Sequence, residues 1–576
     1  MDLSVASPKL KEAQKRGGLK SALSRAVNFI DQLDATGLNR SLLTEAAGLV
    51  RRPGKTGAAV SRFLVGELSA LVASTARLAG APVEGPIPPP AKDRRFADKA
   101  WEENAFFFGL LQGHLLRERL AQELVEAAAL SPVAASKARL MSQLLVEALS
   151  PSNFLWSNPG ALKRAFETGG LSVVRGLMSF LEDVRTRHGW PKQVDGSSFQ
   201  IGKNLAATPG KVVFRNHLME LIQYAPVTAE TYRVPLLLSP PWINKYYIMD
   251  LAPGRSFAEW AVKHGHTTFA ISYRNPDASM HDVSLDDYLL DGPLAATRVI
   301  REITGAPKVN LAALCLGGTL ATMLLAYLNE TGEDWVNSVT LLNTLVDFSE
   351  PGMLGAFTDA KTIERIGRRM AARGYLTAEE MGGTFNLLRS SDLVFSYVAS
   401  RWLMGEPLPA FDLLAWNGDG TRMPARMHMA YLKACYLENR LAKDELVVGG
   451  QHLRPSTIRQ DAFILAAVED HITPWKSSFK TTRLLAGKVR FLLSSSGHIA
   501  GIVNPPHKNA VYWMNDKLEA DPELWRAGAS RRNESWWEEW ARWVSSRAGA
   551  LGAPPPMGST SHPPLMEAPG AYILEH

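Results

Sequence analysis

Short apolar runs recur through the second half of the sequence, each followed by polar or glycine-containing loop residues. The runs lie at residues 234–238, 267–271, 309–314, 338–342, 462–468 and 489–493. Runs of this length, bounded by loop signals, are typical of buried strands. Segments of helical character separate the earlier runs. Because alternating strands and helices build mostly parallel sheets, the pattern predicts an α/β fold.

The third run belongs to a longer uncharged stretch, residues 309–328. Its length would suit a membrane helix of about 20 residues. However, Cys315-Leu316-Gly317-Gly318 interrupts the stretch, which predicts a buried strand at 309–314 and a buried helix over 319–328. A strand, a nucleophile followed by glycine and a helix together are typical of a nucleophile elbow, whose flanking positions must be small. Those positions are Ala313 and Gly317.

Candidate partners for Cys315 follow the last two predicted strands. Asp470 comes just after the run at 462–468, and His498 comes just after the run at 489–493. The order nucleophile, acid, histidine is the one that α/β-hydrolase folds require, and ligands gather at the carboxyl ends of parallel strands. We therefore predict a triad in which His498 takes the thiol proton of Cys315 and Asp470 orients the imidazole.

Two backbone N–H groups are candidates for an oxyanion hole. The N–H of Leu316 opens the predicted helix, and the N–H of Trp242 follows Pro240-Pro241 in the loop after the first predicted strand. A cysteine nucleophile suits exchange with another thiol, because displacing one thiolate by another is close to thermoneutral. The pattern therefore favours acyl transfer from a coenzyme A thioester. No metal site is expected, because the sequence offers no set of metal-ligating side chains at a useful spacing.

The first half of the sequence differs in character. Leu19, Leu23, Ala26, Val27 and Ile30 recur at helical spacing and predict an amphipathic helix over 19–33. We predict an N-terminal helical extension (1–80), a proline-rich linker (81–92), a helical domain (93–195), a catalytic domain (196–545) with an inserted cap (346–459), and a Pro/Gly-rich tail (546–576). The tail is expected to be mobile until its last residues, and the cap is expected to keep water from the site.

Composition narrows the class of protein. Hydrophobic residues make up 46% and charged residues 21% of 576 residues, and the net charge of +6 is spread along the chain. These values favour a globular protein with more than one core and give no case for nucleic acid. Two cysteines are too few for a disulfide framework, and the first residues lack an apolar signal core. We expect a cytoplasmic protein with no transmembrane segment.

Longer motifs carry a resemblance to a known family. They include D-R-R-F-A-D-K-A-W-E-E-N (93–104), S-P-S-N-F (150–154), N-L-A-A-T-P-G-K-V-V-F-R-N (204–216), P-P-W-I-N-K-Y-Y-I-M-D (240–250), S-Y-R-N-P-D-A-S (272–279), E-D-H-I-T-P-W, S-G-H-I-A-G-I-V-N-P-P, S-W-W-E-E-W-A-R-W (535–543) and A-P-G-A-Y (568–572). Together they cover the chain from about residue 90 to its end, and the sequence resembles the polyhydroxyalkanoate synthases of the single-subunit class, the poly(3-hydroxybutyrate) polymerase family. One departure is Ala313, where the family box usually opens with glycine.

The resemblance implies an α/β-hydrolase catalytic domain, an N-terminal helical domain and a homodimer. It implies polymerisation of (R)-3-hydroxyacyl-coenzyme A, with coenzyme A released as a product and no other cofactor. The family's catalytic residues fall on Cys315, Asp470 and His498. His498, with or without Asp470, would also deprotonate the 3-hydroxyl group that attacks the acyl-cysteine. The growing polyester and its granule surface are the implied partners.

Two other classes of function stay open at this point. One is a cysteine-type esterase, thioesterase or polyester depolymerase, because the same triad serves hydrolysis. The other is a non-catalytic protein that coats the granule and keeps only the fold. The pattern does not decide the chain length of the monomer, the residues that bind coenzyme A, or whether one site or two serve a growing chain.

Overall fold

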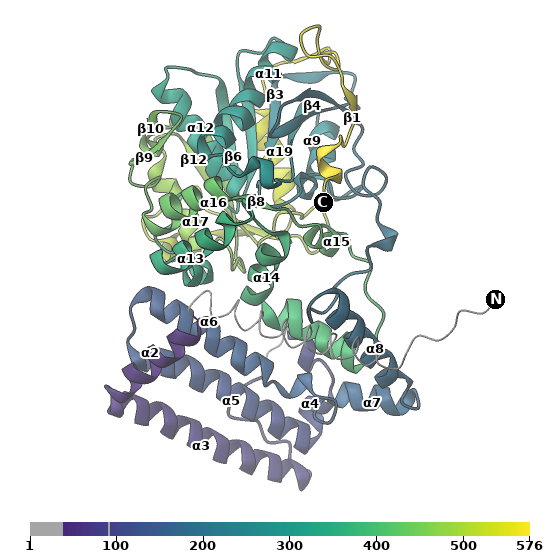
Figure 1. Ribbon diagram of the computed structural model, residues 1–576, viewed down its shortest axis with the longest axis vertical. Helices are drawn as coiled ribbons and strands as arrows, with labels where there is room; N and C mark the ends of the chain where they lie inside the picture. Colours follow the sequence, from purple (N-terminus) through teal and green to yellow (C-terminus); the bar gives the residue numbers. More distant parts are fainter. Residues whose placement is uncertain (1–37, 90–92) are drawn as a thin grey trace, which may run out of the picture. The chain divides into compact units, whose positions relative to one another are not determined.

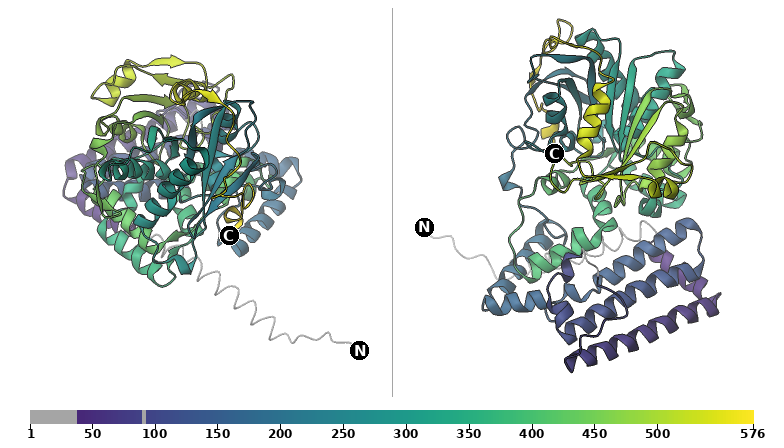
Figure 2. Two further views of the ribbon diagram at one scale, coloured as in Figure 1. Left: turned by 90° about the horizontal axis from the view of Figure 1, so that it is seen from above. Right: turned by 180° about the vertical axis from the view of Figure 1, so that it is seen from behind.

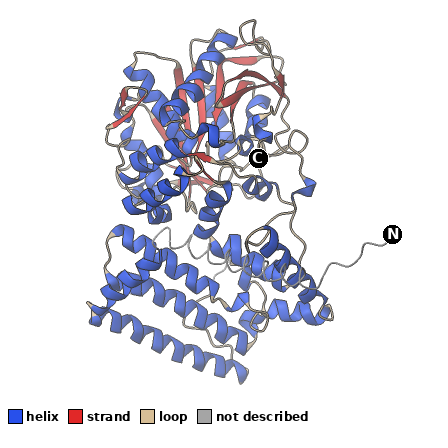
Figure 3. Ribbon diagram, in the orientation of Figure 1, coloured by secondary structure: helices blue, strands red, loops and turns tan. Residues whose placement is uncertain are grey.

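The computed structural model describes residues 38–89 and 93–576, so the helix predicted at 19–33 lies outside the described residues. The chain forms two compact units. One comprises the residues up to Val194 together with Gly383–Pro409, and the other comprises Asp195–Gly382 together with Ala410–His576. In the described part of the chain every strand belongs to the second unit, whereas the first is helical (Figure 3).

The first unit is a bundle of helices (Figure 1). Its helices are α2 (Leu38–Val50), α3 (Pro53–Leu78), α4 (Ala100–Glu103), α5 (Ala105–Ala128), α6 (Pro132–Ala148), α7 (Pro159–Glu167) and α8 (Leu171–Thr186). Pro53 and Pro132 open α3 and α6, and the Asn104 side chain accepts backbone N–H bonds at the start of α5. The described part of the predicted extension is not a separate body, because α2 and α3 pack on α5.

Helix α3 has an unusual division of side chains between its two sides. The side that packs inward carries the small buried residues Ala59, Gly66, Ala70 and Ala73, and a Cβ on Gly66 would lie 2.4 Å from the Leu116 side chain. The other side exposes large apolar residues, namely Val60, Leu64, Val65, Leu68, Leu71, Val72 and Leu78. Among the described helices, α3 alone is long and apolar enough to cross a membrane, a test that the core helix of a soluble protein also passes.

The insertion predicted at 346–459 is divided between the two units. Its helices are α13 (Ala360–Ala371), α14 (Ala378–Leu388), α15 (Asp412–Gly418) and α16 (Ala425–Tyr431), with short strands β7 (Tyr375–Leu376), β8 (Met423–Pro424), β9 (Leu446–Val448) and β10 (Gln451–Leu453). Its middle part, Gly383–Pro409, belongs to the helical unit. There the buried Asp183 of α8 accepts hydrogen bonds from Arg401 (3.1 Å) and from the Trp402 indole (2.8 Å). The predicted cap is therefore not a single body.

The second unit is built on one sheet of twelve strands. The strands are β1 (Gly210–Arg215), β2 (Met219–Tyr224), β3 (Thr231–Ser239), β4 (His266–Tyr273), β5 (Val309–Leu314), β6 (Val336–Leu342), β11 (Asp461–Ala467), β12 (Val489–Ser494), β13 (Tyr512–Met514), β14 (Ser530–Arg532), β15 (Leu551–Gly552) and β16 (Met566–Glu567). Their order is β14-β13-β12-β11-β6-β5-β3-β4-β2-β1-β16, with β15 beside β3. Strands β4, β3, β5, β6, β11 and β12 run parallel.

Helices cover both faces of this sheet (Figures 1 and 2). They are α9 (Phe257–Lys263), α10 (Leu285–Leu289), α11 (Ala295–Thr304), α12 (Leu316–Glu330), α17 (Trp475–Leu484), α18 (Pro522–Ala527) and α19 (Trp536–Ser545). Helix α19, yellow in Figure 2, buries Trp536, Trp537 and Trp540, and the Trp540 indole donates to the Thr340 hydroxyl on β6 at 3.0 Å. The six predicted strands are confirmed as β3, β4, β5, β6, β11 and β12.

Strands β1 and β2 escaped prediction because polar residues interrupt them. The Glu220 carboxylate on β2 accepts the backbone N–H groups of Ala571 and Tyr572, and the Gln223 amide on β2 accepts the N–H of Gly558. These polar side chains therefore bind the tail of the chain. The expectation that the tail is mobile is wrong for the same reason, since β15 and β16 also pair with β3 and β1.

Candidate active site

Cys315 lies at the sharp turn between strand β5 and helix α12. Its backbone has φ 52° and ψ −120°, a strained conformation for a residue with a Cβ. A Cβ on Gly317 would lie 2.1 Å from the carbonyl oxygen of Ser239, so only glycine fits where α12 passes the end of β3. Ala313 on the other side is fully buried, and its methyl group is accommodated. This geometry is that of a nucleophile elbow.

Asp470 and His498 meet beyond the ends of the neighbouring parallel strands β11 and β12. The Nδ1 atom of His498 lies 2.7 Å from Oδ2 of Asp470, and both side chains are buried. Asp470 also accepts the backbone N–H groups of Ile472 and Thr473, each at 2.8 Å, and the Thr473 hydroxyl at 2.7 Å. These bonds fix the carboxylate, and the carboxylate in turn orients the imidazole.

Cys315 interacts with the same imidazole, by a side-chain hydrogen bond and by charge. Burial by itself lowers the pKa of His498, but the Asp470 carboxylate and Cys315 outweigh it and raise the pKa to about 10. Burial likewise opposes ionisation of Asp470, yet the His498 charge and the hydrogen bonds from His498 and Thr473 hold its pKa below the usual value. The structure thus brings together the three side chains that the sequence singled out, in surroundings that favour the charged form of the imidazole.

Two tyrosines of the insertion complete the surroundings of the thiol. Tyr431 is buried and Tyr436 is half-buried, their ring centroids are 5.5 Å apart, and each interacts electrostatically with Cys315. Burial, with a smaller contribution from this interaction, raises the pKa of both phenols far above its ordinary value. Tyr431 directly precedes a π-helical turn, Leu432–Leu437, and Tyr436 lies within it, so the two residues are five apart and approach each other. An ordinary α-helical period of 3.6 residues does not place residues 431 and 436 on one face, so the sequence pattern did not single out these tyrosines.

The second cysteine lies in the same turn. Cys435 is fully buried, and burial raises its pKa to about 12. A thiol in such an environment stays protonated and unreactive. Its burial agrees with a structural role.

The two predicted oxyanion donors lie on either side of the elbow. Leu316 is the first residue of α12, where N–H groups have no acceptor within the helix. Trp242 follows β3 and is buried, with its ring 5.5 Å from that of Tyr431 and 5.9 Å from that of Tyr288. The contact of Gly317 with the end of β3 keeps the two segments together. The role of both N–H groups stays a prediction.

The described residues contain no group of three or more His, Cys, Asp or Glu side chains that could hold a metal ion. Asp250, in one of the motifs quoted above, instead forms a buried polar cluster with Thr208, Ser256 and Tyr224. Burial raises the pKa of this carboxyl to about 6, although hydrogen bonds from Thr208, Ser256 and Tyr224 oppose the shift. The cluster ties β2 to the loop after β3.

Comparisons with known proteins agree with this architecture. Residues 92–261 match the family described as poly-beta-hydroxybutyrate polymerase (PhaC) N-terminus, and residues 244–505 match the alpha/beta hydrolase fold. The chain is 40% identical over 560 residues to "Poly(3-hydroxyalkanoate) polymerase" of Methylorubrum extorquens, covering 96% of this chain and 92% of the relative. It is 39% identical to the "Poly(3-hydroxyalkanoate) polymerase subunit PhaC" of Cupriavidus necator, covering 92% and 90%.

A third relative, from Rhizobium meliloti, carries the same subunit name and is 39% identical over 506 residues, covering 86% of this chain and 82% of its own. The similarity therefore spans both compact units, and Cys315, Asp470 and His498 lie within residues 244–505, which match the alpha/beta hydrolase fold. The elbow, the parallel sheet and the helical unit agree with it. This chain belongs to the poly(3-hydroxyalkanoate) polymerase family and is an acyltransferase built on the α/β-hydrolase fold.

Proposed function

We propose that this enzyme polymerises (R)-3-hydroxyacyl-coenzyme A, with 3-hydroxybutyryl-coenzyme A as the main substrate, and releases coenzyme A. In this proposal Cys315 carries the acyl group, and His498 and Asp470 move and hold the proton. The observation that carries the proposal is the contact of the Cys315 thiol with a buried imidazole whose pKa is raised to about 10. A charged imidazole stabilises the thiolate, which is the reactive form of cysteine.

Acylation follows from this ion pair. The Cys315 thiolate attacks the thioester carbonyl, the bond between the carbonyl carbon and the coenzyme A sulfur breaks, and protonated His498 gives its proton to the departing sulfur. The backbone N–H groups of Leu316 and Trp242 would bind the oxyanion. After this step the thiolate charge is gone, so one of the interactions that raise the His498 pKa is lost. The imidazole is then neutral and ready to act as a base.

Chain extension uses the neutral imidazole. His498 takes the proton of a 3-hydroxyl group, the hydroxyl oxygen attacks the acyl-cysteine, and the Cys315 thiolate leaves. A new ester bond forms, and the imidazolium–thiolate pair is restored. Asp470 stays ionised throughout, which its lowered pKa and its three further hydrogen bonds favour. Both half-reactions balance without an oxidant, a reductant or a metal.

Hydrolysis of the acyl-cysteine competes with chain extension unless water is kept out. We propose that the part of the insertion beside Cys315 provides this protection, since the buried Tyr431 and the half-buried Tyr436 both interact with Cys315. The test is incubation with 3-hydroxybutyryl-coenzyme A, followed by measurement of free coenzyme A, polymer and free 3-hydroxybutyrate. Polymer accounting for most of the released coenzyme A supports the synthase, whereas free acid without polymer would show a thioesterase.

We further propose that the protein works in the cytoplasm as a homodimer on the surface of the polyester that it makes. The exposed apolar side of α3 supports this proposal, because its large residues face away from α5 while its small residues face inward. An apolar polymer surface would cover such a side. Replacement of Leu64 and Leu68 by glutamate should lower the fraction of enzyme that sediments with polymer granules, while acylation of Cys315 in solution stays unchanged. Equal sedimentation would exclude α3 as the contact.

A further inference from the structure

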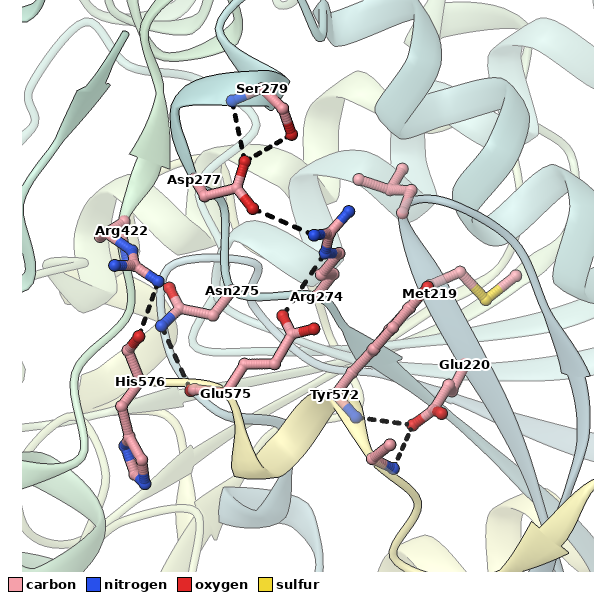
Figure 4. Close-up of polar contacts among 12 residues, drawn as sticks. Met219, Glu220, Arg274, Asn275, Asp277, Ser279, Arg422, Tyr572, Glu575 and His576 are labelled. Atoms are coloured by element: carbon pink, nitrogen blue, oxygen red, sulfur yellow. Dashed lines mark hydrogen bonds and ion pairs between the residues drawn. The ribbon is translucent and has the colours of Figure 1, made fainter. Parts of the chain in front are cut away.

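The last residues of the sequence, Ile573–His576, are bound by side chains from three distant segments of the catalytic unit. Figure 4 shows two of these side chains, Asn275 and Arg422, at Glu575 and His576. The Lys245 ammonium donates to the backbone carbonyl of Ile573 at 2.8 Å and also to that of Glu575. The Arg422 guanidinium donates to the backbone oxygen of the last residue, His576, at 2.8 Å, and the Asn275 amide donates to the carbonyl of Glu575 at 3.3 Å. We call these three side chains and the carbonyls that they bind the clamp.

Lys245 is the member of the clamp whose charged group is buried. Its side chain is buried, with 3% exposure, and burial lowers its pKa, an effect that the Asp419 and Glu575 carboxylates partly offset. A buried ammonium group needs acceptors, because an unpaired charge in the interior is strongly unfavourable. In the described part of the chain, both of its hydrogen bonds go to the last residues of the sequence. The carbonyl groups of Ile573 and Glu575 therefore stabilise the buried ammonium group of Lys245 in this position.

The position of Lys245 gives the clamp a connection to the proposed chemistry. It lies three residues after Trp242, in the loop whose N–H group is a candidate oxyanion donor. Its backbone carbonyl accepts the Trp416 indole at 2.9 Å, and the neighbouring Asn244 forms a strand-like bridge with Gly420. The loop after β3 is thus joined to the segment by which the insertion returns to the sheet.

The second anchoring segment follows strand β4. The backbone N–H of Arg422 donates to the Asn275 side chain at 2.9 Å, so the two residues hold each other as well as the terminal carbonyls. Arg274 pairs with the Glu575 carboxylate at 3.5 Å. Asn275 lies just after β4, and Arg422 lies in the insertion just before β8. The clamp therefore ties three parts of the unit that are far apart in the sequence.

Hydrogen bonds hold the tail along the edge of the sheet just before the clamp. The Tyr572 hydroxyl donates to the carbonyl of Asn216 at 2.6 Å, and the N–H groups of Ala571 and Tyr572 donate to Glu220. Figure 4 shows Tyr572 and Glu220 on one side of Glu575, with Arg274, Asn275 and Arg422 around it. Three motifs quoted in the sequence analysis, 240–250, 272–279 and 568–572, meet here, and the proposed mechanism uses none of these anchoring residues.

We propose that the clamp positions the loop that carries Trp242 and the returning strand of the insertion, and so sets the rate of acylation of Cys315. Lys245, Asn275 and Arg422 are positioning residues in this proposal, since they act through the loop and not on substrate. The inference rests on the proposed function in one respect: Trp242 is taken to supply an oxyanion donor. Misplacement of such a group typically costs one to three powers of ten in rate.

The experiment compares the full chain with two variants, a chain that ends at Tyr572 and the single substitution Lys245→Met. Acylation of Cys315 by a p-nitrophenyl ester is followed in the first turnover, together with kcat and KM for 3-hydroxybutyryl-coenzyme A. We expect each variant to acylate about tenfold to hundredfold more slowly, with kcat lowered and KM unchanged. The variant carrying both changes should be no slower than the truncated chain, because both changes remove the same interaction.

Leu574→Ser is the matched control, because the Leu574 side chain is exposed while its backbone keeps the clamp intact. It should acylate at the rate of the unmodified chain. If the truncated chain fails to fold, Lys245→Met alone decides the question, with thermal unfolding measured beside acylation. Acylation at the unmodified rate in a folded Lys245→Met enzyme would overturn the clamp. Absence of Cys315 acylation in the unmodified chain would instead overturn the proposed function, so the two failures are distinguishable.

Discussion

The two cysteines of this chain are both buried, yet their surroundings differ. Cys315 stands at a strained turn beside an imidazole that is itself held by a carboxylate. Cys435 lies in a π-helical turn, where burial raises its pKa to about 12. Burial alone therefore suppresses a thiol, and reactivity requires a charged partner placed within the same buried space. The strained turn and the neighbouring imidazole, more than the solvent exposure of the sulfur, therefore distinguish the nucleophile Cys315 from the core residue Cys435.

The largest expected effect comes from removing the sulfur itself. Cys315→Ala should lower polymer formation to background, a loss of about 10⁴-fold or more, because no other group is placed to carry the acyl chain. Cys435→Ala is the matched control and should retain activity within about threefold, apart from a loss of stability of about 1 kcal/mol from the small cavity. The measurement is coenzyme A release with 3-hydroxybutyryl-coenzyme A. Equal losses of coenzyme A release in Cys315→Ala and Cys435→Ala would contradict the different roles assigned to the two cysteines.

The next effect concerns the charge on His498. The Asp470 carboxylate and Cys315 outweigh burial and raise the pKa of His498 in the folded protein to about 10. In the proposed mechanism this imidazole supports the thiolate form of Cys315. An ordinary thiol with a pKa near 8.5 is about 1% ionised at pH 6.5. His498→Gln should therefore lower the rate of Cys315 alkylation by iodoacetamide about 100-fold at pH 6.5, and by much less at pH 9.

The unmodified enzyme provides the reference for that profile, and at pH 6.5 it should be alkylated faster than the His498→Gln variant. The Cys315→Ala protein should show no alkylation in the folded state, because Cys435 is buried and protonated. The sign for stability follows from the same shift. The His498 contribution is fully present below pH 6.5, its unfolded pKa, and is lost as the pH rises towards 10. An alkylation profile unchanged by His498→Gln would refute the ion pair.

A smaller effect is expected from the tyrosines that surround the thiol. Tyr431 and Tyr436 hydrogen-bond each other, and both interact with Cys315. Tyr436→Phe removes one neutral donor near the thiolate, a loss of about 1 kcal/mol, so acylation should slow about fivefold. The ratio of polymer to free acid should stay unchanged, because the ring that helps to exclude water is retained. Tyr436→Ala removes the ring as well and should raise the share of free acid. Equal product ratios for the two variants would contradict this separation of roles.

The elbow and the six central strands were predictable because fully buried parallel strands appear in the sequence as uninterrupted apolar runs. The meeting of Cys315, Asp470 and His498 was predictable for a related reason, since each follows or ends one of those runs and the carboxyl ends of parallel strands share one edge. No periodic pattern predicts the bond between Arg401 and Asp183, which are 218 positions apart. The division of the insertion between the two units therefore depends on a long-range contact that the sequence pattern does not predict.

Composition misled the interpretation of the tail. Proline and glycine between 546 and 576 predicted mobility, whereas the segment is held by strand pairing and by the polar side chains Glu220 and Gln223. A tail rich in proline and glycine can still be ordered when its backbone groups find hydrogen-bond partners. The same polar side chains hid strand β2 from prediction. The missed strand β2 and the wrongly expected mobility of the tail have one cause, because the polar side chains of β2 accept hydrogen bonds from the backbone of the tail.

The smallest expected effect tests which part of the elbow makes Cys315 different from Cys435. Ala313 is fully buried in β5, paired with Ser239 and Leu341, and its Cβ is accommodated. Ala313→Gly should therefore leave acylation within about twofold and lower stability by about 1 kcal/mol, through backbone entropy and the lost methyl group. Gly317→Ala on the opposite flank should abolish activity, because its Cβ would lie 2.1 Å from the Ser239 carbonyl oxygen. Acylation more than tenfold faster in Ala313→Gly would show that this methyl group restrains the turn.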